Sequence, residues 1–481
     1  MAHLVEAPVS TQGFLLDGKW IESGDAVEIR SPYDGSIVGR VFQGMREHAE
    51  AAIAAAVKAF GTTRRLPAFE RQRVLRRVAE AITARKEEFA HTIAQEAGKP
   101  IKAARSEVER SIFTFTVAAE ESTRIYGEYL PLDWRESTAG RWGIVRRFPL
   151  GPVAGITPFN FPLNLVAHKV APAIASGCSM VLKPAPQTPL SALLLAETIQ
   201  QAGWPDGALN VLPLSNEDAS LLVTDDRLKM ISFTGSAAVG WDIKRRAGKK
   251  KVVLELGGNA GVIVHSDADL SYAADRCASG GFSYAGQTCI SVQRILVERS
   301  VFGKFSEMLV ERVQKLVTGD PLDESTDLGP MIRESDAVRV VDWIKEAVGG
   351  GARILCGGHR EGSLVESTVL TGTRAEMKVN CQEIFGPVVT LESYENFDDA
   401  LRQINNSPYG LQAGIFTRDS TLLFKAYEEL EVGAVVAGDV PTFRIDQMPY
   451  GGIKDSGLGR EGLKYAIEEM TEPKLLVMNL R

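Results

Sequence analysis

The sequence contains little cysteine and little histidine, and this scarcity argues against two kinds of site. Of the 481 residues, five are cysteines and six are histidines, and no two of them form a CxxC or an HxxxH pair. A zinc site and a disulfide framework are therefore not expected. An odd number of scattered cysteines is typical of a reducing compartment, so we predict a cytoplasmic protein without a metal in its site.

The sequence also lacks an excess of charge of one sign. The net charge is −7, and acidic and basic residues are interspersed. We therefore expect no nucleic-acid partner and no polybasic membrane segment. An uncharged stretch at 150–167 is long enough for a membrane span, but three prolines and two asparagines interrupt it. Residues 1–6 show neither the basic region nor the apolar run that begins a signal peptide.

The length and the apolar patterns predict an α/β protein of several domains. A chain of this length corresponds to about two to four domains. Turn residues between short apolar pieces predict a small β-meander over 11–45, and helical spacing predicts three or four helices over 46–126. Residues 127–149 look extended, as a hairpin or a bridging strand.

Short apolar strands then alternate with helices, which predicts parallel sheets covered on both faces. The first series runs from Val153 to Phe233 and includes a helix at Asn216–Val223. The second begins after Glu255 and includes a helix at Phe302–Val317. The tail at Leu475–Leu480 is predicted to be a strand that adds to another sheet or another subunit.

One of the five cysteines stands where a reactive thiol would be useful. Cys289 lies in the stretch Tyr-Ala-Gly-Gln-Thr-Cys-Ile at 284–290, beside a glycine and small polar residues. A nucleophilic thiol needs access and either a lowered pKa or a nearby base. On this stretch alone, the alternative is a half-buried structural cysteine.

A carboxylate and an amide occupy similarly unusual places. Glu255 follows the apolar residues Val252–Leu254 and precedes two glycines, and burial there would raise its pKa and suit it to general-base work. Asn160 lies at the centre of the uncharged loop 157–162, where a side-chain amide can donate to a developing oxyanion. The alternatives are a carboxylate at a strand end and an asparagine that completes a turn.

Three other stretches suit a phosphate, a ribose or a flat ring. The predicted strand before Gly235 runs into a helix start, whose N–H groups favour phosphate, although the GxGxxG fingerprint is absent. Lys183 follows a predicted strand and can reach a phosphate or ribose. Glu383 and Phe385 share a face if their segment is extended, so they could hold a ribose and a ring. A plain turn, a surface lysine and a strand end are the alternatives.

Taken together, these stretches resemble the aldehyde dehydrogenase superfamily, in its hydrolytic, NAD(P)-dependent type, over nearly the whole chain. Eight stretches match in family order: Glu96–Pro100, Thr157–Pro162, Lys183-Pro184, Phe233–Gly240, Glu255–Asn259, Gly286–Cys289, Glu383–Pro387, and Pro449–Gly452 with Ser456-Gly457 and Gly459–Glu461. A single matching stretch would be weak evidence for this resemblance, whereas eight stretches in the same order are specific to the superfamily.

The resemblance implies a role for each candidate residue. Cys289 attacks the aldehyde carbonyl, and the Asn160 amide and the Cys289 backbone N–H hold the oxyanion. Hydride then passes to the nicotinamide and leaves a thioester, which water activated by Glu255 hydrolyses. Lys169 and Glu461 are implied as proton-relay partners. The implied cofactor contacts are Ile156, Thr157, Pro158, Phe159, Lys183, Gly235, Ser236, Leu256, Glu383 and Phe385.

Two positions bear on the co-substrates. Many NAD-preferring members carry a glutamate three residues after the lysine, and this chain has Pro186 there, so the cofactor is expected to be NAD or NADP. CoA-acylating relatives generally lack a glutamate equivalent to Glu255, so its presence favours hydrolysis to the free acid. The alternatives are a CoA-acylating semialdehyde dehydrogenase and a non-catalytic binding protein on the same scaffold.

The resemblance also implies a fold with three parts: two parallel-sheet α/β domains and, in addition, a β-strand oligomerisation element. Residues 1–128 and 148–256 are assigned to an NAD(P)-binding domain and 257–446 to a catalytic domain. Residues 129–147 and 447–481 are assigned to the oligomerisation element, and a homodimer or homotetramer is implied.

The residues expected around the substrate are more polar than in many relatives. Asn164 and His168 follow the oxyanion loop, where relatives often carry bulky apolar groups, and Thr288 and Ile290 flank Cys289. Arg444 precedes the Pro449–Gly452 stretch and is expected near the tunnel mouth. We therefore predict a small polar or anionic aldehyde, such as a hydroxyaldehyde or a semialdehyde; the alternative is a structural arginine.

Overall fold

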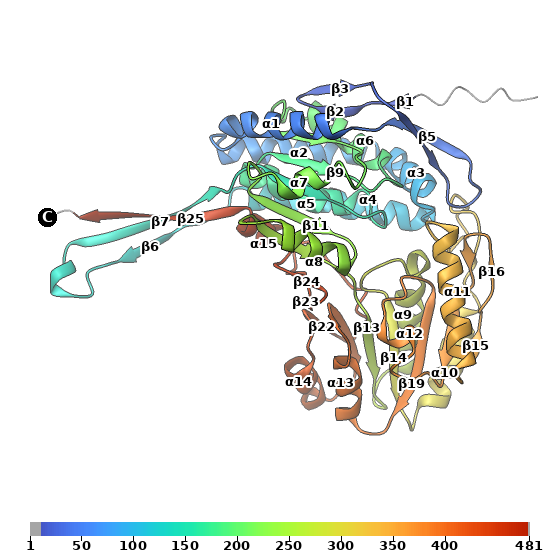
Figure 1. The fold of residues 1–481 in the computed structure, drawn as a ribbon. Coiled ribbons are helices and arrows are strands. Elements are labelled where there is room, and N and C mark those ends of the chain that lie inside the picture. Colours follow the sequence, from blue (N-terminus) through green and yellow to red (C-terminus); the bar gives the residue numbers. More distant parts are fainter. Residues whose placement is uncertain (1–10, 480–481) are drawn as a thin grey trace, which may run out of the picture.

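The computed structural model describes residues 11–479, which form two α/β bodies and a projecting arm (Figure 1). Residues 1–6, which we do not expect to begin a signal peptide, lie outside the described residues. Leu480, the end of the predicted tail strand, also lies outside them. Within 11–479, no helix combines the length and the apolar character that crossing a membrane requires.

The first body is built on an eight-stranded sheet with the order β24-β12-β11-β8-β9-β10-β2-β3. Its five central strands are parallel: β8 (Val153–Ile156), β9 (Met180–Lys183), β10 (Leu209–Val211), β11 (Met230–Thr234) and β12 (Lys251–Glu255). They read as continuous apolar runs because helices cover both faces of the sheet. The antiparallel edge strands are β2 (Phe14–Leu16), β3 (Lys19–Ile21) and β24 (Gly457–Leu458).

The helices of this body follow the predicted spacing closely. The region 46–126 forms four of them, α1 (Arg46–Thr63), α2 (Ala68–Ala84), α3 (Lys86–Ala97) and α4 (Ile101–Glu121). The others are α5 (Asn164–Ser176), α6 (Leu190–Gln201), α7 (Ser220–Thr224), α8 (Ala237–Arg246) and α15 (Leu463–Glu469). A small sheet of β1 (Thr11–Gln12), β4 (Ala26–Arg30) and β5 (Ile37–Phe42) lies beside them.

The second body has a seven-stranded sheet with the order β15-β18-β19-β14-β13-β21-β22. Its strands are β13 (Ala260–Val264), β14 (Val292–Glu298), β15 (Arg353–Cys356), β18 (Thr368–Thr371), β19 (Val388–Tyr394), β21 (Gln412–Phe416) and β22 (Ala434–Ala437). All pairs except β15 with β18 are parallel. Its larger helices are α9 (Leu270–Phe282), α10 (Phe302–Val313), α11 (Glu334–Gly349), α13 (Phe397–Asn405) and α14 (Ser420–Glu429).

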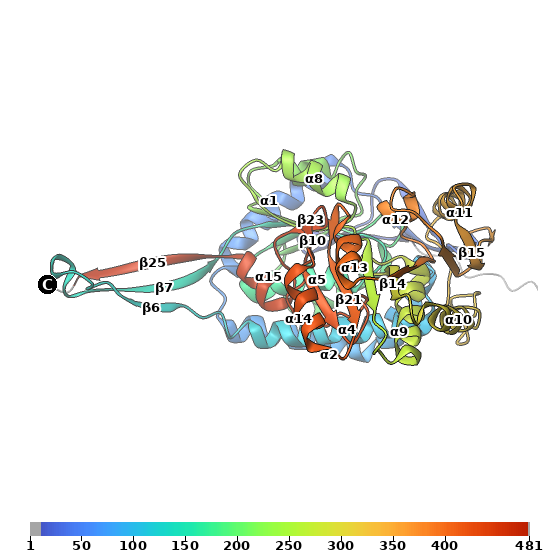
Figure 2. The same cartoon turned by 90° about the horizontal axis from the view of Figure 1, so that it is seen from below.

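The arm is a three-stranded antiparallel sheet that projects from the body, and its strand β25 runs to Asn479, the last described residue (Figures 1 and 2). It contains β6 (Glu128–Pro131), β7 (Arg141–Pro149) and β25 (Thr471–Asn479). The strand β25 pairs with β7 along its whole length, and Leu475, Leu476 and Val477 on it are exposed. The predicted tail strand is thus present within the described residues.

Three details differ from the sequence-based expectation. The helix predicted at Asn216–Val223 shrinks to α7, because Ser215 accepts from the Asp218 N–H in a local turn that competes with helix formation. The predicted helix from Phe302 ends at Val313 rather than at 317. The segment with Glu383 is not extended, since Phe385 has a φ of 48°, so the expected alternation of faces is wrong there.

The predicted domain boundaries stay predictions. Of the segment 447–481, β25 lies in the arm, whereas β24 pairs with β12 of the first sheet. In the same segment, β23 (Ile453–Lys454) pairs with β20 (Tyr409–Gly410).

Candidate active site

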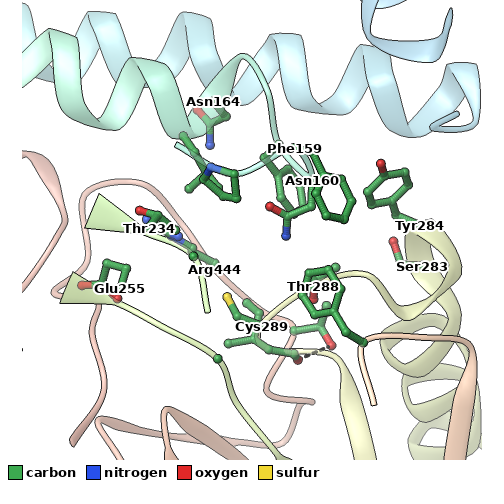
Figure 3. A pocket seen from close by; sticks show the side chains of 18 of the residues that line it. Phe159, Asn160, Asn164, Thr234, Glu255, Ser283, Tyr284, Thr288, Cys289 and Arg444 are labelled. Atoms are coloured by element: carbon green, nitrogen blue, oxygen red, sulfur yellow. Dashed lines mark hydrogen bonds between the residues drawn. The ribbon is translucent and has the colours of Figure 1, made fainter. Parts of the chain in front are cut away.

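A cavity of about 650 Å³ brings the candidate residues together. It lies beyond the carboxyl ends of β11 and β12, where ligands of open α/β sheets bind, and residues of the second body complete its wall. Figure 3 shows the sulfur of Cys289 near the middle of the view, with Asn160 above it and Glu255 to its left. Cys289, Asn160 and Glu255 all line the cavity.

An unusual backbone turn presents Cys289 to this cavity. After α9 the chain passes through Tyr284, Ala285 and Gly286, which have φ values of 49°, 51° and 67°. Left-handed conformations are costly for residues other than glycine, and such strain concentrates at functional sites. A Cβ on Gly286 would lie 2.2 Å from the carbonyl oxygen of Gly386, so only glycine fits there. The Tyr284 hydroxyl secures the turn by donating to the Ala97 carbonyl at 2.7 Å.

Within residues 11–479, the Cys289 thiol has one close polar partner. Its Sγ lies 3.0 Å from the Tyr450 hydroxyl, and either atom can be the donor. Burial raises the pKa of Cys289 to about 11, although the Tyr450 hydrogen bond and the charge of Arg444 act in the opposite direction. A thiol in such a setting becomes a nucleophile only with help from its neighbours.

The amide of Asn160 is held close to the cysteine loop. Its Nδ2 donates to the Gln287 carbonyl at 2.9 Å, which leaves one N–H of the amide for another acceptor. The backbone carbonyl of Asn160 accepts from Lys99 Nζ at 2.7 Å. This lysine forms a fully buried ion pair with Glu107, whose other oxygen accepts from the backbone N–H groups of Leu163 and Asn164 at 3.0 and 3.1 Å.

The carboxylate of Glu255 has an environment that points to function. It ends β12, is 3% exposed, and neither oxygen has a hydrogen-bond partner within residues 11–479. Buried polar groups in folded proteins are almost always paired, so an unpaired carboxylate needs an explanation. Burial, and then the nearby charge of Glu461, raise the pKa of Glu255 well above its ordinary value. Such a group suits a general base near neutral pH.

Lys169 and Glu461, the two predicted proton-relay partners, form a buried ion pair close to this carboxylate. Lys169 Nζ donates to Glu461 at 3.2 Å and also to Ser232 and Thr234 at 3.0 and 2.8 Å. The second oxygen of Glu461 accepts from Arg444 at 3.0 Å. Burial opposes ionisation of Glu461, but Lys169 and Arg444 outweigh it and hold its pKa at about 2.

Seven of the predicted cofactor residues line the same cavity: Pro158, Phe159, Gly235, Ser236, Leu256, Glu383 and Phe385. The rings of Phe159 and Phe385 meet edge to face with centroids 5.9 Å apart. Glu383 accepts from the Gly258 N–H at 2.9 Å, and burial raises its pKa to about 7. A Cβ on Gly257 would lie 2.2 Å from this carboxylate, so the glycine permits the close approach.

The other three predicted cofactor residues, Ile156, Thr157 and Lys183, lie outside this cavity lining. Lys183 is 4% exposed, ends β9, and has no carboxylate within ion-pair distance among residues 11–479. Burial lowers the pKa of Lys183 to about 8. A buried ammonium without a counter-charge at a strand's carboxyl end fits a ligand that supplies phosphate or hydroxyl oxygens, as a dinucleotide does.

Comparison with known proteins identifies the family. A model of the "Aldehyde dehydrogenase family" matches residues 20–476. The chain belongs to the aldehyde dehydrogenase family. It is 44% identical over 473 residues to a 3-sulfolactaldehyde dehydrogenase of Priestia megaterium, covering 98% of this chain and 99% of that one.

Comparison with solved structures leads to the same family. The chain matches aldehyde dehydrogenase 21 from Physcomitrella patens, in complex with the product succinate, with a TM-score of 0.97 and 48% identity, over 98% and 99% of the two chains. It matches a glyceraldehyde-3-phosphate dehydrogenase, GapN, from Methanocaldococcus jannaschii complexed with NADP, with a TM-score of 0.92 and 41% identity, over 95% and 100%. The predicted family, the α/β fold class and an NAD(P)-dependent oxidoreductase acting on aldehydes are thereby confirmed.

In this aldehyde dehydrogenase, three arginines line the cavity, Arg110, Arg339 and Arg444, together with Asn164. The Arg444 guanidinium lies 3.7 Å from the centre of the Tyr450 ring. Burial alone would lower the pKa of Arg444, but the groups around it, Tyr450 and Glu461 first, raise it, so the guanidinium stays charged. Arg110 pairs with Asp446 at 2.7 Å.

His168 does not take the place expected for it. It is 2% exposed and does not line the cavity, and its Nε2 lies 2.8 Å from Asp446. Burial, followed by the charge of Arg444, lowers the pKa of His168. The expectation that His168 lines the substrate tunnel is therefore wrong, whereas Thr288 and Ile290 do line the cavity.

Sequence reasoning missed Tyr450, Lys99, Glu107 and Asp446. Lys99 and Tyr450 each fell within a quoted stretch, but neither stretch reveals a partner at a distance of 60 residues or more. Glu107 left a usable signal, because it is the charged residue on the mostly apolar face that α4 buries with Ala104, Val108 and Phe115. A buried charge at such a position predicts an ion pair.

Proposed function

We propose that this aldehyde dehydrogenase oxidises a short aldehyde with a second, anionic or polar group to the free carboxylic acid. The observation that carries the proposal is the pair of guanidinium groups, Arg110 and Arg444, in the cavity that holds Cys289. Arginine presents several donors in a planar fork that suits carboxylate, sulfonate and phosphate oxygens. Asp446 already engages Arg110 and Glu461 already engages Arg444, but Arg444 Nε has no hydrogen-bond partner within residues 11–479, so a donor remains for an anionic group.

The names of the relatives support an anionic substrate. The Priestia relative is named for 3-sulfolactaldehyde, the moss enzyme holds succinate, and GapN is named for glyceraldehyde 3-phosphate. Each of these molecules is small and carries an anionic group. A lactaldehyde dehydrogenase of Methanococcus aeolicus, 40% identical, keeps a neutral hydroxyaldehyde open as the alternative.

In the proposed first step, the thiolate of Cys289 attacks the aldehyde carbon. A C–S bond forms, the carbonyl π electrons move to oxygen, and the product is a thiohemiacetal with an oxyanion. The free N–H of the Asn160 amide and the backbone N–H of Cys289 donate to that oxygen. Donors already held in place stabilise such a charge without reorganisation.

The cofactor would occupy the wall that contains Phe159, Glu383 and Phe385, and when bound its oxidised nicotinamide accepts the hydride from the reacting carbon. Glu383 would accept hydrogen bonds from ribose hydroxyls, and Phe385 would pack against the ring. Gly235, Ser236 and Leu256 would flank it, and Ile156 to Phe159 would contact the cofactor along the loop after β8. Lys183 would contact the more distant phosphate or ribose oxygens.

In the proposed last step, Glu255 takes a proton from a water molecule that attacks the thioester carbonyl. The C–S bond breaks, and the carboxylic acid and the Cys289 thiolate are released. Lys169 and Glu461 would pass the proton on from Glu255 towards solvent. Both lie close enough to Glu255 to change its pKa, which Glu461 raises and Lys169 lowers, and this proximity supports the assignment.

The proposed activity is tested with a panel of short aldehydes and purified protein, by following the absorbance of the reduced cofactor. We expect turnover without CoA with NAD, NADP or both, and higher kcat/KM for aldehydes with a carboxylate, sulfonate or phosphate group. Turnover that appears only when CoA is added would support the acylating alternative. No turnover under any condition would support the binding-protein alternative.

Replacing Arg444 tests the substrate class. In Arg444→Ala we expect kcat/KM for an anionic aldehyde to fall by about 10- to 100-fold, because a charge-assisted hydrogen bond is lost. A neutral aldehyde of the same length should lose clearly less, and this serves as the internal control for the broken contact with Glu461. In Arg110→Gln, kcat/KM for the anionic aldehyde should likewise fall more than kcat/KM for the neutral aldehyde. Equal losses for the charged and the neutral aldehyde would refute the proposed role.

Replacing Pro186 tests cofactor selection. Pro186 is exposed and lies three residues after Lys183, so a new side chain there meets no packing constraint. In Pro186→Glu we expect kcat/KM with NADP to fall about tenfold relative to NAD, because a carboxylate repels the 2′-phosphate. Pro186→Gln is the uncharged control and should leave the ratio closer to that of the wild type. An unchanged ratio in Pro186→Glu would contradict this placement of the 2′-phosphate.

We further propose the predicted division into an NAD(P)-binding domain (1–128 and 148–256), a catalytic domain (257–446) and an oligomerisation element (129–147 and 447–481). The exposed apolar residues on the arm support its role in forming a homodimer or homotetramer. All five cysteines are free, which supports a reducing, cytoplasmic location.

A further inference from the structure

The nucleophilic sulfur proposed above faces a buried tyrosine that the reaction scheme does not use. Tyr450 is 2% exposed, and its hydroxyl lies 3.0 Å from Cys289 Sγ. Its ring packs in a small apolar cluster with Ile290 and Leu411, against which Cys289 also packs. A buried tyrosine hydroxyl requires a polar partner, and among residues 11–479 the thiol is the partner recorded for it.

We propose that Tyr450 is a positioning residue whose hydroxyl donates a hydrogen bond to Cys289 Sγ, which fixes the direction of the sulfur and stabilises it as the thiolate. The inference rests on the proposed function, because the sulfur that Tyr450 positions is the proposed nucleophile.

The direction of this hydrogen bond follows from the chemistry of the two groups. In the neutral pair either atom can donate, but a thiolate carries no hydrogen, so the bond persists only if the tyrosine donates. Burial, and then the proximity of Cys289, raise the pKa of Tyr450 well above its ordinary value, so the phenol stays protonated. Tyr450 therefore acts as a donor and does not act as a base towards the thiol.

The surroundings of Tyr450 strengthen it as a donor. The Arg444 guanidinium lies 3.7 Å from the centre of its ring, and a cation there draws electron density from the phenol. Arg444 is itself fixed by Glu461 at 3.0 Å. The backbones of Tyr450 and Glu461 exchange two hydrogen bonds, of 3.0 and 2.7 Å, so the ring and the cation are held by the same segment.

The test compares Tyr450→Phe with the wild type, without aldehyde or cofactor. Iodoacetamide reacts with the thiolate, which displaces iodide, and the modified Cys289 peptide is quantified by mass spectrometry between pH 6 and pH 10. Other charged or titratable groups that face Cys289 are Arg444, Glu383 and Glu255, and they are unchanged in this variant. We expect alkylation of Cys289 to be about tenfold slower in Tyr450→Phe at pH 8, because a donor to the thiolate is lost.

The pH at which alkylation becomes fast should move upward by about one unit, which corresponds to the tenfold change in rate, and the acid limb of kcat/KM should move with it. A purely structural role would not move these profiles. Tyr394→Phe is the matched control, since Tyr394 is buried and bonds His265 at 3.0 Å. It should alkylate at Cys289 as the wild type does.

Superimposable alkylation profiles for Tyr450→Phe and the wild type would overturn the inference, whatever the enzymatic activity. Because alkylation needs no substrate, this outcome is distinct from a failure of the proposed function, which the aldehyde panel would reveal. If the alkylation profile of Tyr450→Phe is shifted but the wild type oxidises no aldehyde, the Tyr450–Cys289 hydrogen bond would be supported and the dehydrogenase activity would be rejected.

Discussion

Cys289→Ala is expected to lower kcat for aldehyde oxidation by at least about 10⁴-fold, to the limit of detection. In the proposed scheme the reacting carbon is bonded to its sulfur from the first step to the last, and removing a covalent nucleophile typically costs this much or more. The change is small in volume and the side chain is only half buried, so the fold should persist. The measurement is the rate of formation of reduced cofactor at saturating aldehyde.

The matched control for this variant is Cys356→Ala. Cys356 is also half buried but lies on β15 at the edge of the second sheet, away from the cavity lining. It should retain wild-type kcat. If Cys289→Ala retained more than about one hundredth of the wild-type rate, covalent catalysis through this residue would have to be abandoned.

Glu255→Gln is expected to separate the two halves of the reaction. The amide cannot take a proton from water, and loss of a general base typically costs about 10²–10⁴-fold. We expect one equivalent of reduced cofactor per active site in a first burst, followed by a steady-state rate lower by about that factor. Stopped-flow absorbance measures both phases, and hydroxylamine should accelerate the second by attacking the accumulated thioester.

The pH dependence of this step follows from the environment of Glu255. Burial and the charge of Glu461 raise its pKa well above the ordinary value, so the base is protonated and inactive below that pKa and active above it. The steady-state rate of the wild type should therefore rise with pH through this pKa, and Glu255→Gln should lose the rise. Because Glu255 and Glu461 lie close together, the apparent value belongs to the pair.

Glu392→Gln provides the control for the change from carboxylate to amide. Glu392 is a half-buried glutamate on β19 that accepts from the N–H and hydroxyl of Thr373, outside the cavity. It should show wild-type kinetics. A Glu255→Gln enzyme with no burst and no slow phase would place Glu255 in the first step instead.

The Glu255 prediction depends on how the charges around this carboxylate are paired. Glu255 carries no hydrogen bond within the described residues, while Glu461 next to it is paired with both Lys169 and Arg444. The cations thus stabilise one carboxylate of the pair as an anion, which leaves the other with a raised pKa. Two titratable groups whose environments push their pKa values apart are typical of acid–base sites.

Much of this protein could be derived from its sequence. Apolar runs such as Val153–Ile156 in the first sheet and Ala260–Val264 in the second are typical of strands covered on both faces, so their pattern predicted two parallel sheets. Local sequence also marked Cys289, Glu255 and Asn160, because a glycine-flanked thiol, a carboxylate after an apolar strand and an amide in an uncharged loop are each unusual within a few residues.

Only the tertiary structure decided which side chains meet. The contacts Cys289–Tyr450 and Lys99–Asn160 join residues 161 and 61 positions apart, and no local pattern encodes such a distance. The same packing placed His168 behind the cavity against Asp446, contrary to the expectation from its position after the oxyanion loop. The physical reason is that apolar periodicity acts over one helix or strand, whereas the pairing and burial of charges depend on how separate elements pack against one another.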